Sequence, residues 1–328
     1  MLNIKKTEIK KKKVKIIAFL KITAFLLLYK IKAALFKKFR LPLITSFKIT
    51  QKCNLKCLHC PFWKINTQKI KTQKLNGGQN LDFSKVTQIL NRLKKDGIKI
   101  IIFEGGEPLL WKDLKNNKDI NDVIKYSKKL FFITGVTTNG TIDLSNYDPD
   151  IFFVSIDGLK DTHDKIRGKS FDKILENIEA NKNKKIIVNI CISKINIDKF
   201  EDLIKFLNDK VYGITVQFFY PFENLPNLTL SQNEKEDVIN KLLELKKQNL
   251  KLLNSSAALT KMKNNSWKCL DFLVASVEFD GSISYGCYLK NKVKNISCKD
   301  CGFSVHCEIS LAYSLNLDAI CNAKKIFL

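Results

Sequence analysis

Nine of the ten cysteines in this 328-residue chain fall into two groups, and this distribution points to chemistry. Three lie close together in the segment CNLKCLHC, at Cys53, Cys57 and Cys60. Six more lie between residues 269 and 321, and Cys191 stands alone in an apolar segment. Disulfide scaffolds are typical of short secreted chains, whereas tight cysteine spacings in a larger protein indicate metal or cluster sites. The cysteines therefore predict bound metal in a reducing, cytosolic environment.

The first group has the spacing of an iron–sulfur site that leaves one iron open. Cysteine thiolates are the ligands of such clusters, and four of them normally complete a four-iron cube. Three thiolates on one short loop leave one iron free, and a free coordination position distinguishes a reactive metal site from a structural one. A cofactor with adjacent amino and carboxylate groups could chelate that iron. The alternative is a zinc site that combines the three cysteines with His59.

A scaffold of alternating strands and helices is predicted to position this loop. Six apolar segments have the length and composition of buried strands: Leu43–Ile49, Ile98–Phe103, Phe131–Val136, Ile151–Ile156, Ile186–Ile192 and Ile214–Phe219. The clearest helix between them is Asp82–Asp96, with Asp82 as its N-cap and Gly97 at its end. Because parallel strands need crossover connections, the alternation predicts an α/β fold with a parallel sheet. Six such units fit a partial (β/α)6 TIM-like barrel.

Polar and glycine-containing motifs follow the second, third and fourth predicted strands. They are Glu104-Gly105-Gly106-Glu107-Pro108, Thr137-Thr138-Asn139-Gly140 and Ser155-Ile156-Asp157-Gly158. Each alone is also typical of a simple turn, but binding sites of β/α folds lie at the carboxyl ends of strands. Glycine allows a close backbone approach, and Glu107 can accept a hydrogen bond from an ammonium group. Arg167 follows the fourth strand, and its guanidinium suits a carboxylate.

The cysteine loop and these motifs resemble the radical S-adenosylmethionine (SAM) superfamily over about residues 43–220. The resemblance implies a four-iron (4Fe-4S) cluster on Cys53, Cys57 and Cys60. It implies that SAM is bound by His59, Gly105, Gly106, Glu107, Pro108, Asn139, Ser155, Asp157 and Arg167. In that family the residue at the place of His59 is usually aromatic and lies near the adenine. The family pattern further implies that Glu107 receives the methionyl amino group and that Arg167 pairs with the cofactor carboxylate.

The resemblance also implies an activity. A radical SAM enzyme cleaves SAM reductively to a 5′-deoxyadenosyl radical, which here would take hydrogen from a peptide, a cofactor precursor or a lipid-linked substrate. A low-potential electron donor such as a ferredoxin or flavodoxin is implied as a partner. The alternative is a basic metal-binding protein that contacts RNA without redox catalysis. That alternative does not explain the ordered strand-end motifs, and no convincing aromatic-interleaved basic stripe supports nucleic-acid binding.

The C-terminal cysteines predict a separate small module. A β-hairpin is expected from Val274 to Tyr285, with Asp280-Gly281 as its turn. The following spacing, Cys298-x2-Cys301-x5-Cys307, resembles the SPASM-type extension of radical SAM enzymes. That resemblance implies an auxiliary 4Fe-4S cluster held by Cys298, Cys301, Cys307 and Cys321, with Cys269 and Cys287 as further candidate ligands.

The module also departs from the SPASM pattern. Leu311 occupies a position where the extension usually has a cysteine, so Cys269 and Cys287 lack partners for a second cluster. One auxiliary cluster is therefore expected, and a four-cysteine zinc knot is the alternative. We expect Cys191 to be a buried core residue and His306 to face solvent.

The N-terminal segment is both basic and apolar. Residues 1–40 contain twelve lysines and Arg40 against Glu8 alone, in a chain whose net charge is +25. Such a segment favours a polyanionic partner, and a helix at an anionic membrane surface fits the apolar run from residue 14 to 39 better than a span does. The alternative is a helix packed on the enzyme's own barrel. The expected location is cytoplasmic, with a peripheral contact to the inner face of the membrane.

These elements divide the chain into four expected parts. Residues 1–42 form the N-terminal helical segment and residues 43–225 the barrel core. Residues 226–265 form a helical connector, in which Ser231 and Glu234 spell a capping box that begins a helix. Residues 266–328 form the cysteine-rich module.

Overall fold

The computed structural model describes residues 23–33, 35, 40–61, 81–222, 228–290, 292–293 and 295–328, and the statements below concern these residues. Of the N-terminal segment, only the part from residue 23 is therefore described.

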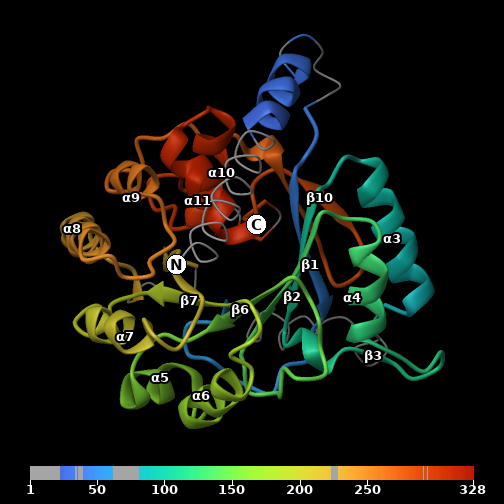
Figure 1. Ribbon diagram of the computed structural model, residues 1–328, viewed down its shortest axis with the longest axis horizontal. Coiled ribbons are helices and arrows are strands. Elements are labelled where there is room, and N and C mark those ends of the chain that lie inside the picture. Colours follow the sequence, from blue (N-terminus) through green and yellow to red (C-terminus); the bar gives the residue numbers. More distant parts are fainter. Residues whose placement is uncertain are drawn as a thin grey trace, which may run out of the picture.

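A twisted eight-stranded sheet forms the centre of the molecule (Figure 1). Its strand order is β10-β9-β1-β2-β5-β6-β7-β8. The strands are β1 (Ile44–Thr50), β2 (Ile100–Gly105), β5 (Ile133–Thr138), β6 (Ile151–Ser155), β7 (Ile186–Ile192), β8 (Gly213–Phe218), β9 (Val274–Val277) and β10 (Ile283–Tyr285). Every neighbouring pair from β9 to β8 is parallel, and only β10 runs antiparallel. The α/β prediction and all six predicted strands are confirmed, and the sheet is that of a partial barrel.

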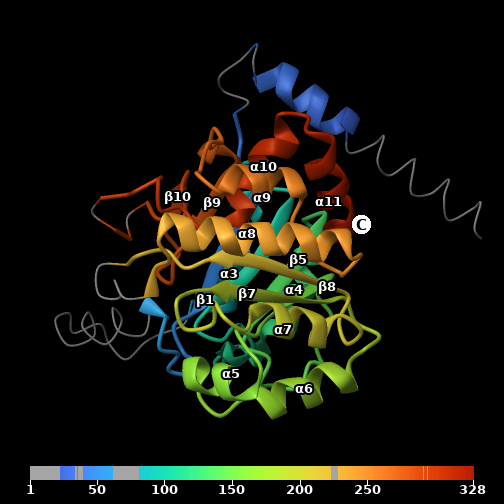
Figure 2. The same ribbon diagram turned by 90° about the vertical axis from the view of Figure 1, so that its left-hand side faces the viewer.

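Helices follow the strands along the chain and cover the outer face of the sheet (Figures 1 and 2). They are α3 (Phe83–Lys95), α4 (Ile120–Lys128), α5 (Lys160–Arg167), α6 (Phe171–Ala180), α7 (Phe200–Leu207) and α8 (Gln232–Lys247). The C-terminal part adds α9 (Ser256–Met262), α10 (Ser304–Tyr313) and α11 (Leu317–Phe327). The short elements are 3₁₀ turns η2 (Pro108–Leu110) and η4 (Asp271–Leu273) and a two-stranded ribbon of β3 (Lys112–Asp113) and β4 (Lys118–Asp119).

Local sequence signals set the ends of two helices as predicted. Asp82 caps α3 by accepting a hydrogen bond from the Lys85 amide, and Gly97 follows the helix with φ of +95°. Ser231 and Glu234 form the capping box of α8. This helix ends at Lys247, and the chain then turns through Asn249 with φ of +60°. A positive φ favours glycine or asparagine and ends a helix.

Strand alternation separates two apolar layers. Side chains such as Phe47, Phe103 and Val154 pack beneath the outer helices in the main core. On the inner side, Ile133, Ile151 and Ile187 form a smaller cluster, and Ile326 and Phe327 at the end of α11 pack against it. Apolar side chains therefore fill the inner side of the sheet near the amino ends of the strands. The polar motifs lie at the carboxyl ends, on the opposite edge of the sheet.

The C-terminal hairpin is part of the same sheet. Strand β9 pairs in parallel with β1, so that Ile44 lies opposite Val274, and β10 pairs with β9. The cysteine-rich part was expected to be separate, but its hairpin continues the barrel sheet at the β1 edge. The predicted hairpin is confirmed, with Gly281 at φ of +82° in the turn.

The described part of the N-terminal helix packs on the C-terminal helices, at the top of Figure 1. Leu26 is 8% exposed and shares an apolar cluster with Leu273 and Ile320. The Tyr29 ring meets the Tyr313 ring edge to face, with centroids 5.8 Å apart. The helix therefore packs on the chain's own surface, as the alternative expected, but on the C-terminal module. Within the described residues, no helix has the length and hydropathy needed to cross a bilayer.

Candidate active site

Cys53, Cys57 and Cys60 lie in the loop that follows β1, at the carboxyl edge of the sheet. Burial raises the pKa of the Cys53 and Cys57 thiols, to about 11 for Cys57, and the nearby Cys60 raises both further. The amide of Leu58 donates to the Ile166 carbonyl at 2.8 Å, which fixes the loop to α5. The three predicted ligands thus lie in one loop, close enough for Cys60 to act on the other two thiols.

Gly105 and Gly106 pack directly against the start of this loop. A Cβ on Gly105, which has φ of +140°, would lie 2.4 Å from the Thr50 carbonyl oxygen, and one on Gly106 would lie 2.2 Å from that of Lys52. The amides of Gly106 and Glu107 donate to the same two carbonyls, each at 2.7 Å. Only glycine permits so close an approach. The glycine pair therefore fixes the path of the cysteine loop.

The Glu107 carboxylate is fully buried and bonded within the protein. Its Oε1 accepts from the Thr138 hydroxyl at 2.8 Å and the Leu109 amide at 3.1 Å, and its Oε2 accepts from the Asn139 amide at 2.7 Å. Burial raises its pKa to about 7, although these hydrogen bonds oppose the shift. Each carboxylate oxygen has two lone pairs, so Oε2 can accept a second donor. Its predicted contact with the methionyl amino group stays a prediction.

Asn139 links the third strand end to the cysteine loop. Its Nδ2 donates to Asn54 Oδ1 at 2.8 Å and lies 4.0 Å from Cys53 Sγ. Its Oδ1 accepts from the Thr141 hydroxyl at 2.7 Å, and Asn54 Nδ2 donates to the same hydroxyl at 2.8 Å. Asn54 and Thr141 were not predicted as site residues. Their only sequence signal is their place beside the cysteine and Thr-Asn-Gly motifs.

Asp157 and Arg167 form a buried pair beside the cysteine loop. The Arg167 Nε donates to Asp157 Oδ2, and its NH1 lies 3.8 Å from Cys57 Sγ. His59 Nε2 is 3.6 Å from Asp157 Oδ2 and 3.5 Å from Arg167 NH2. Although burial opposes it, Arg167 holds the pKa of Asp157 below its usual value, whereas burial lowers the pKa of His59 to about 4. Three predicted cofactor residues and one ligand therefore meet here.

Asp157 is enclosed by protein donors, and its predicted contact with the cofactor stays a prediction. It is 0% exposed, and its Oδ1 accepts from the Cys191 amide at 2.8 Å. Asn196 Nδ2 donates to the Asp157 carbonyl at 2.7 Å and to that of Cys191 at 3.0 Å. Because its oxygens are directed to protein donors, Asp157 positions Arg167 and His59.

Two other residues complete this edge. Ser155 ends β6 opposite Asn189 of β7, and its predicted cofactor contact stays a prediction. Cys191 alternates with the buried Ile190 and Ile192 on β7 and faces the inner side of the sheet. Burial and then Asp157 raise its pKa. The expected place of Cys191 in the apolar core is therefore wrong.

Four C-terminal cysteines surround a small cavity of about 50 Å³. They are Cys269, Cys287, Cys298 and Cys301. Burial raises the pKa of the Cys269 thiol to about 12, and Cys301, Cys287 and Cys298 raise it further. Within the described part of the chain, no three His, Cys, Asp or Glu side chains form a site for a single metal ion.

The other two predicted auxiliary ligands are placed differently. Cys307 is 0% exposed on α10 and its thiol donates to the Ala258 carbonyl at 3.8 Å, whereas Cys321 is exposed on α11. Neither lines the cavity. The structure thus groups Cys269 and Cys287 with the Cys298–Cys301 loop. Cys307 also lies near this group, because burial raises the pKa of its thiol and Cys301 and Cys269 raise it further. The expected ligand set stays a prediction. His306 is 4% exposed beside Cys269, so its expected solvent-facing position is wrong.

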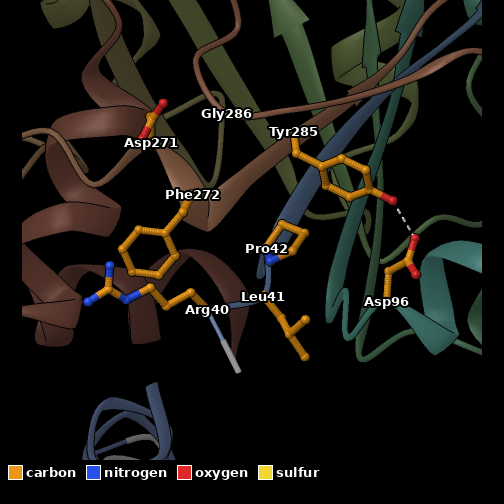
Figure 3. Close-up of a pocket in the computed structure, with 8 residues that line it drawn as sticks. All are labelled: Arg40, Leu41, Pro42, Asp96, Asp271, Phe272, Tyr285 and Gly286. Carbon is orange, nitrogen blue, oxygen red and sulfur yellow. Dashed lines mark hydrogen bonds between the residues drawn. The ribbon is translucent and has the colours of Figure 1, made fainter. Parts of the chain in front are cut away.

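A larger cavity of about 310 Å³ opens near the amino end of β1, away from the cysteine loop (Figure 3). Its walls include Arg40, Phe272 and Tyr285, and the Tyr285 hydroxyl is directed to Asp96. This cavity holds none of the predicted site residues.

Comparison with known proteins agrees with this geometry. Residues 47–207 match the Radical SAM superfamily, and this part of the chain is a radical SAM domain. Among curated proteins, Fe-coproporphyrin III synthase of Methanosarcina barkeri is 26% identical over 152 residues, which are 44% of this chain and 34% of that protein. The cysteine-type anaerobic sulfatase-maturating enzyme of Clostridium novyi is 29% identical over 220 residues, which are 59% of this chain and 56% of that protein.

A solved structure shows the same fold. SuiB of Streptococcus suis, bound to S-adenosylmethionine, superposes with a TM-score of 0.61 at 15% identity, over 78% of this chain and 63% of that chain. The chain thus spans one third to just over one half of the length of the two curated relatives. These matches favour the enzyme prediction over the alternative of an RNA-contacting metal protein.

Proposed function

We propose that this protein is an enzyme that cleaves SAM reductively and uses the resulting radical to take hydrogen from a substrate. The observation that carries the proposal is the contact of Arg167 with both His59 and the Cys57 thiol, on which the thiols of Cys53 and Cys60 also act. When bound there, a reduced four-iron cluster supplies one electron that breaks a carbon–sulfur bond of SAM, giving methionine and a 5′-deoxyadenosyl radical.

The residues fit such a group. The cysteine loop carries three closely spaced thiols, and the glycine pair holds the loop so tightly that a Cβ would collide with its backbone. Three thiolates leave one iron for the amino and carboxylate groups of SAM. Cys53, Cys57 and Cys60 are therefore our proposed ligands.

Side chains around the loop would hold SAM. Arg167 offers the charge for the methionyl carboxylate, and Asp157 keeps it oriented. Glu107 would receive the amino group through the second lone pair of its Oε2. His59 would lie beside the adenine. Ser155 and Asn139 would line the same edge, together with Gly105, Gly106 and Pro108.

A peptide is the substrate class that we favour over a cofactor precursor or a lipid-linked molecule. The support is that SuiB, which shares this fold at a TM-score of 0.59, has been solved with its precursor peptide SuiA. A low-potential ferredoxin or flavodoxin would supply the electron.

We propose one auxiliary iron–sulfur site in the C-terminal module, held by Cys269, Cys287, Cys298 and Cys301. These four thiols surround one cavity and influence one another. Four thiolates would close a four-iron cube, which suits electron transfer. The site lies in the part of the chain whose hairpin extends the barrel sheet.

The N-terminal helix would bring the enzyme to an anionic membrane surface. Its buried side chains face α10 and α11, while Leu28, Ile31 and Leu35 are 60%, 47% and 69% exposed. The surrounding lysines complement an anionic surface, and apolar residues at this spacing suit insertion at the headgroup level.

Product analysis tests the main proposal. Anaerobically reconstituted protein with SAM and dithionite is expected to form 5′-deoxyadenosine and methionine in equal amounts. The C53A/C57A/C60A variant should form neither, because no iron is left open to SAM. C191A is the matched control, since it removes a lone thiol beside Asp157. Turnover by the triple variant at the wild-type rate would contradict the proposal.

A further inference from the structure

Lys235 is a buried lysine that lies against the C-terminal cysteine cavity. It belongs to α8 and is 7% exposed. Its Nζ donates to the Cys301 carbonyl at 3.3 Å and to Asn265 Oδ1 at 3.0 Å. The Phe218 ring centroid lies 5.4 Å from Nζ. The ammonium is therefore directed at the Cys298–Cys301 loop.

Asn265 extends this contact to the whole loop. Its Nδ2 donates to three carbonyls: those of Cys298 at 3.1 Å, Lys299 at 2.6 Å and Cys301 at 3.1 Å. The same amide group presents its Oδ1 to Lys235. One ammonium and one amide thus hold the loop that carries two of the four thiols.

Among the described residues no carboxylate forms a close ion pair with Lys235, and the Asp300 carboxylate acts on it only from a longer distance. The ion pairs of α8 in that part of the chain involve Glu234 and Lys241, but not Lys235. Burying a charge without a partner costs free energy, so buried lysines are normally paired. An iron–sulfur cube with four thiolate ligands is an anion in both of its redox states. Such a group would add the close countercharge that no ion pair of Lys235 supplies.

We propose that Lys235 is a built-in counter-cation that raises the reduction potential of the iron–sulfur cluster held by Cys269, Cys287, Cys298 and Cys301. This inference rests on the proposed auxiliary site. A nearby positive charge stabilises the more negative, reduced state, and burial limits its screening by solvent. The potentials of such clusters depend on net charge and surroundings. Lys235 acts on the site electrostatically and is not a ligand.

The test is a redox titration of the full-length chain carrying C53A/C57A/C60A, so that only the C-terminal cluster contributes to the visible and EPR signals. Dithionite supplies the electron, and mediators report the midpoint potential. K235M is expected to lower the equilibrium constant for one-electron reduction about tenfold, which is about 59 mV. K235R, which keeps the charge, should change it less than threefold.

K246M is the matched control. Lys246 lies on the same helix, and its Nζ donates to the carbonyls of Leu252 at 3.1 Å and Asn254 at 2.6 Å. At 1.5 Å per residue it is about 16 Å along α8 from Lys235. Lys246 is partly buried, so K246M should share the cost of removing a hydrogen-bonded lysine from this helix but leave the potential unchanged.

The outcomes separate the inference from the proposed site. The inference alone would be overturned if K235M keeps the wild-type iron content and its equilibrium constant for reduction changes less than threefold. It would also be overturned if K246M shifts the midpoint potential as much as K235M does. If K235M loses its iron while K235R and K246M keep it, the charge is required to hold the cluster, which supports the inference. Loss in K235R as well would assign Lys235 a packing role and overturn it. Absence of iron before any lysine is changed would instead refute the auxiliary site.

Discussion

Lys48 of β1 and Glu278 of the β9–β10 loop form an ion pair across the seam between the barrel and the C-terminal module. Lys48 Nζ lies 2.9 Å from Glu278 Oε1, and the lysine is 2% exposed. Lys292 approaches the same oxygen at 2.9 Å, and the Tyr288 ring lies beneath both ammonium groups. Although burial opposes it, the two lysines hold the pKa of Glu278 below its usual value. The charges fix the hairpin beside the strand that leads to the cysteine loop.

This pair leads to a prediction about stability. K48M should lower the free energy of unfolding by about 3 kcal/mol, because the remaining charges lose a buried partner. E278Q should lose at least as much, since it removes the carboxylate that Lys48 and Lys292 share. K173M, which breaks the exposed Lys173–Glu176 pair, is the control and should cost under about 1 kcal/mol. Urea unfolding monitored by circular dichroism measures all three, and equal losses in K48M and K173M would contradict the structural role of the seam.

A second prediction concerns iron content. Anaerobically reconstituted protein should bind about eight irons, in two four-iron clusters. Alanine at Cys269, Cys287 or Cys301 should remove about four of them, whereas C321A should remove none, because Cys321 is exposed on α11 away from the cavity. Iron and zinc analysis of each purified variant measures this. Loss of four irons in C321A would restore the ligand set expected from the SPASM resemblance, and zinc in place of iron would indicate a zinc knot.

A third prediction concerns pH and His163. This residue is 0% exposed, its Nε2 is 3.1 Å from Ser170 Oγ, and burial lowers its pKa from the usual 6.5 to about 4. The unfolded chain therefore binds a proton between these two pH values that the folded chain does not. The difference in the free energy of unfolding between wild type and H163Q should be largest above about pH 6.5. It should decrease as the pH falls toward 4.

Thermal unfolding of wild type and H163Q at several pH values in this range checks the prediction. S127A serves as a control, because Ser127 is equally buried but does not titrate. Its stability difference from wild type should stay constant with pH. A constant difference for H163Q would show that the folded protein protonates His163 as readily as the unfolded chain does.

The fourth prediction concerns the membrane surface. Cosedimentation with anionic vesicles should fall for L28E/I31E, because two exposed apolar side chains of the N-terminal helix become charged and repel the lipid. Neutral vesicles should bind wild type less than anionic ones, and added salt should weaken but not abolish binding. L114E/F132E is the control, since both side chains are exposed elsewhere, at 87% and 62%. Equal binding of the two variants would show that the helix is not the contact.

The strands and the cysteine loop were predictable because their signals are local. Runs such as Ile186–Ile192 are apolar over the full length of a buried strand, and that strand is found with the same bounds. The Cys53–Cys60 spacing predicts one site because all three thiols lie within a single loop, whose length alone keeps them close. The caps Asp82 and Ser231 were predictable for the same reason, since each acts on residues three positions away.

Only the tertiary structure decided which distant residues meet. Glu107 is bonded to Thr138 and Asn139, more than thirty positions along the chain. Cys269 reaches the Cys298–Cys301 loop because β9 joins the sheet beside β1 and the hairpin then folds back. Lys235 reaches the same loop from α8. The spacing of residues along the chain does not predict such contacts, because they depend on how helices and strands pack. Burial then determines the charge and the hydrogen bonding of each group.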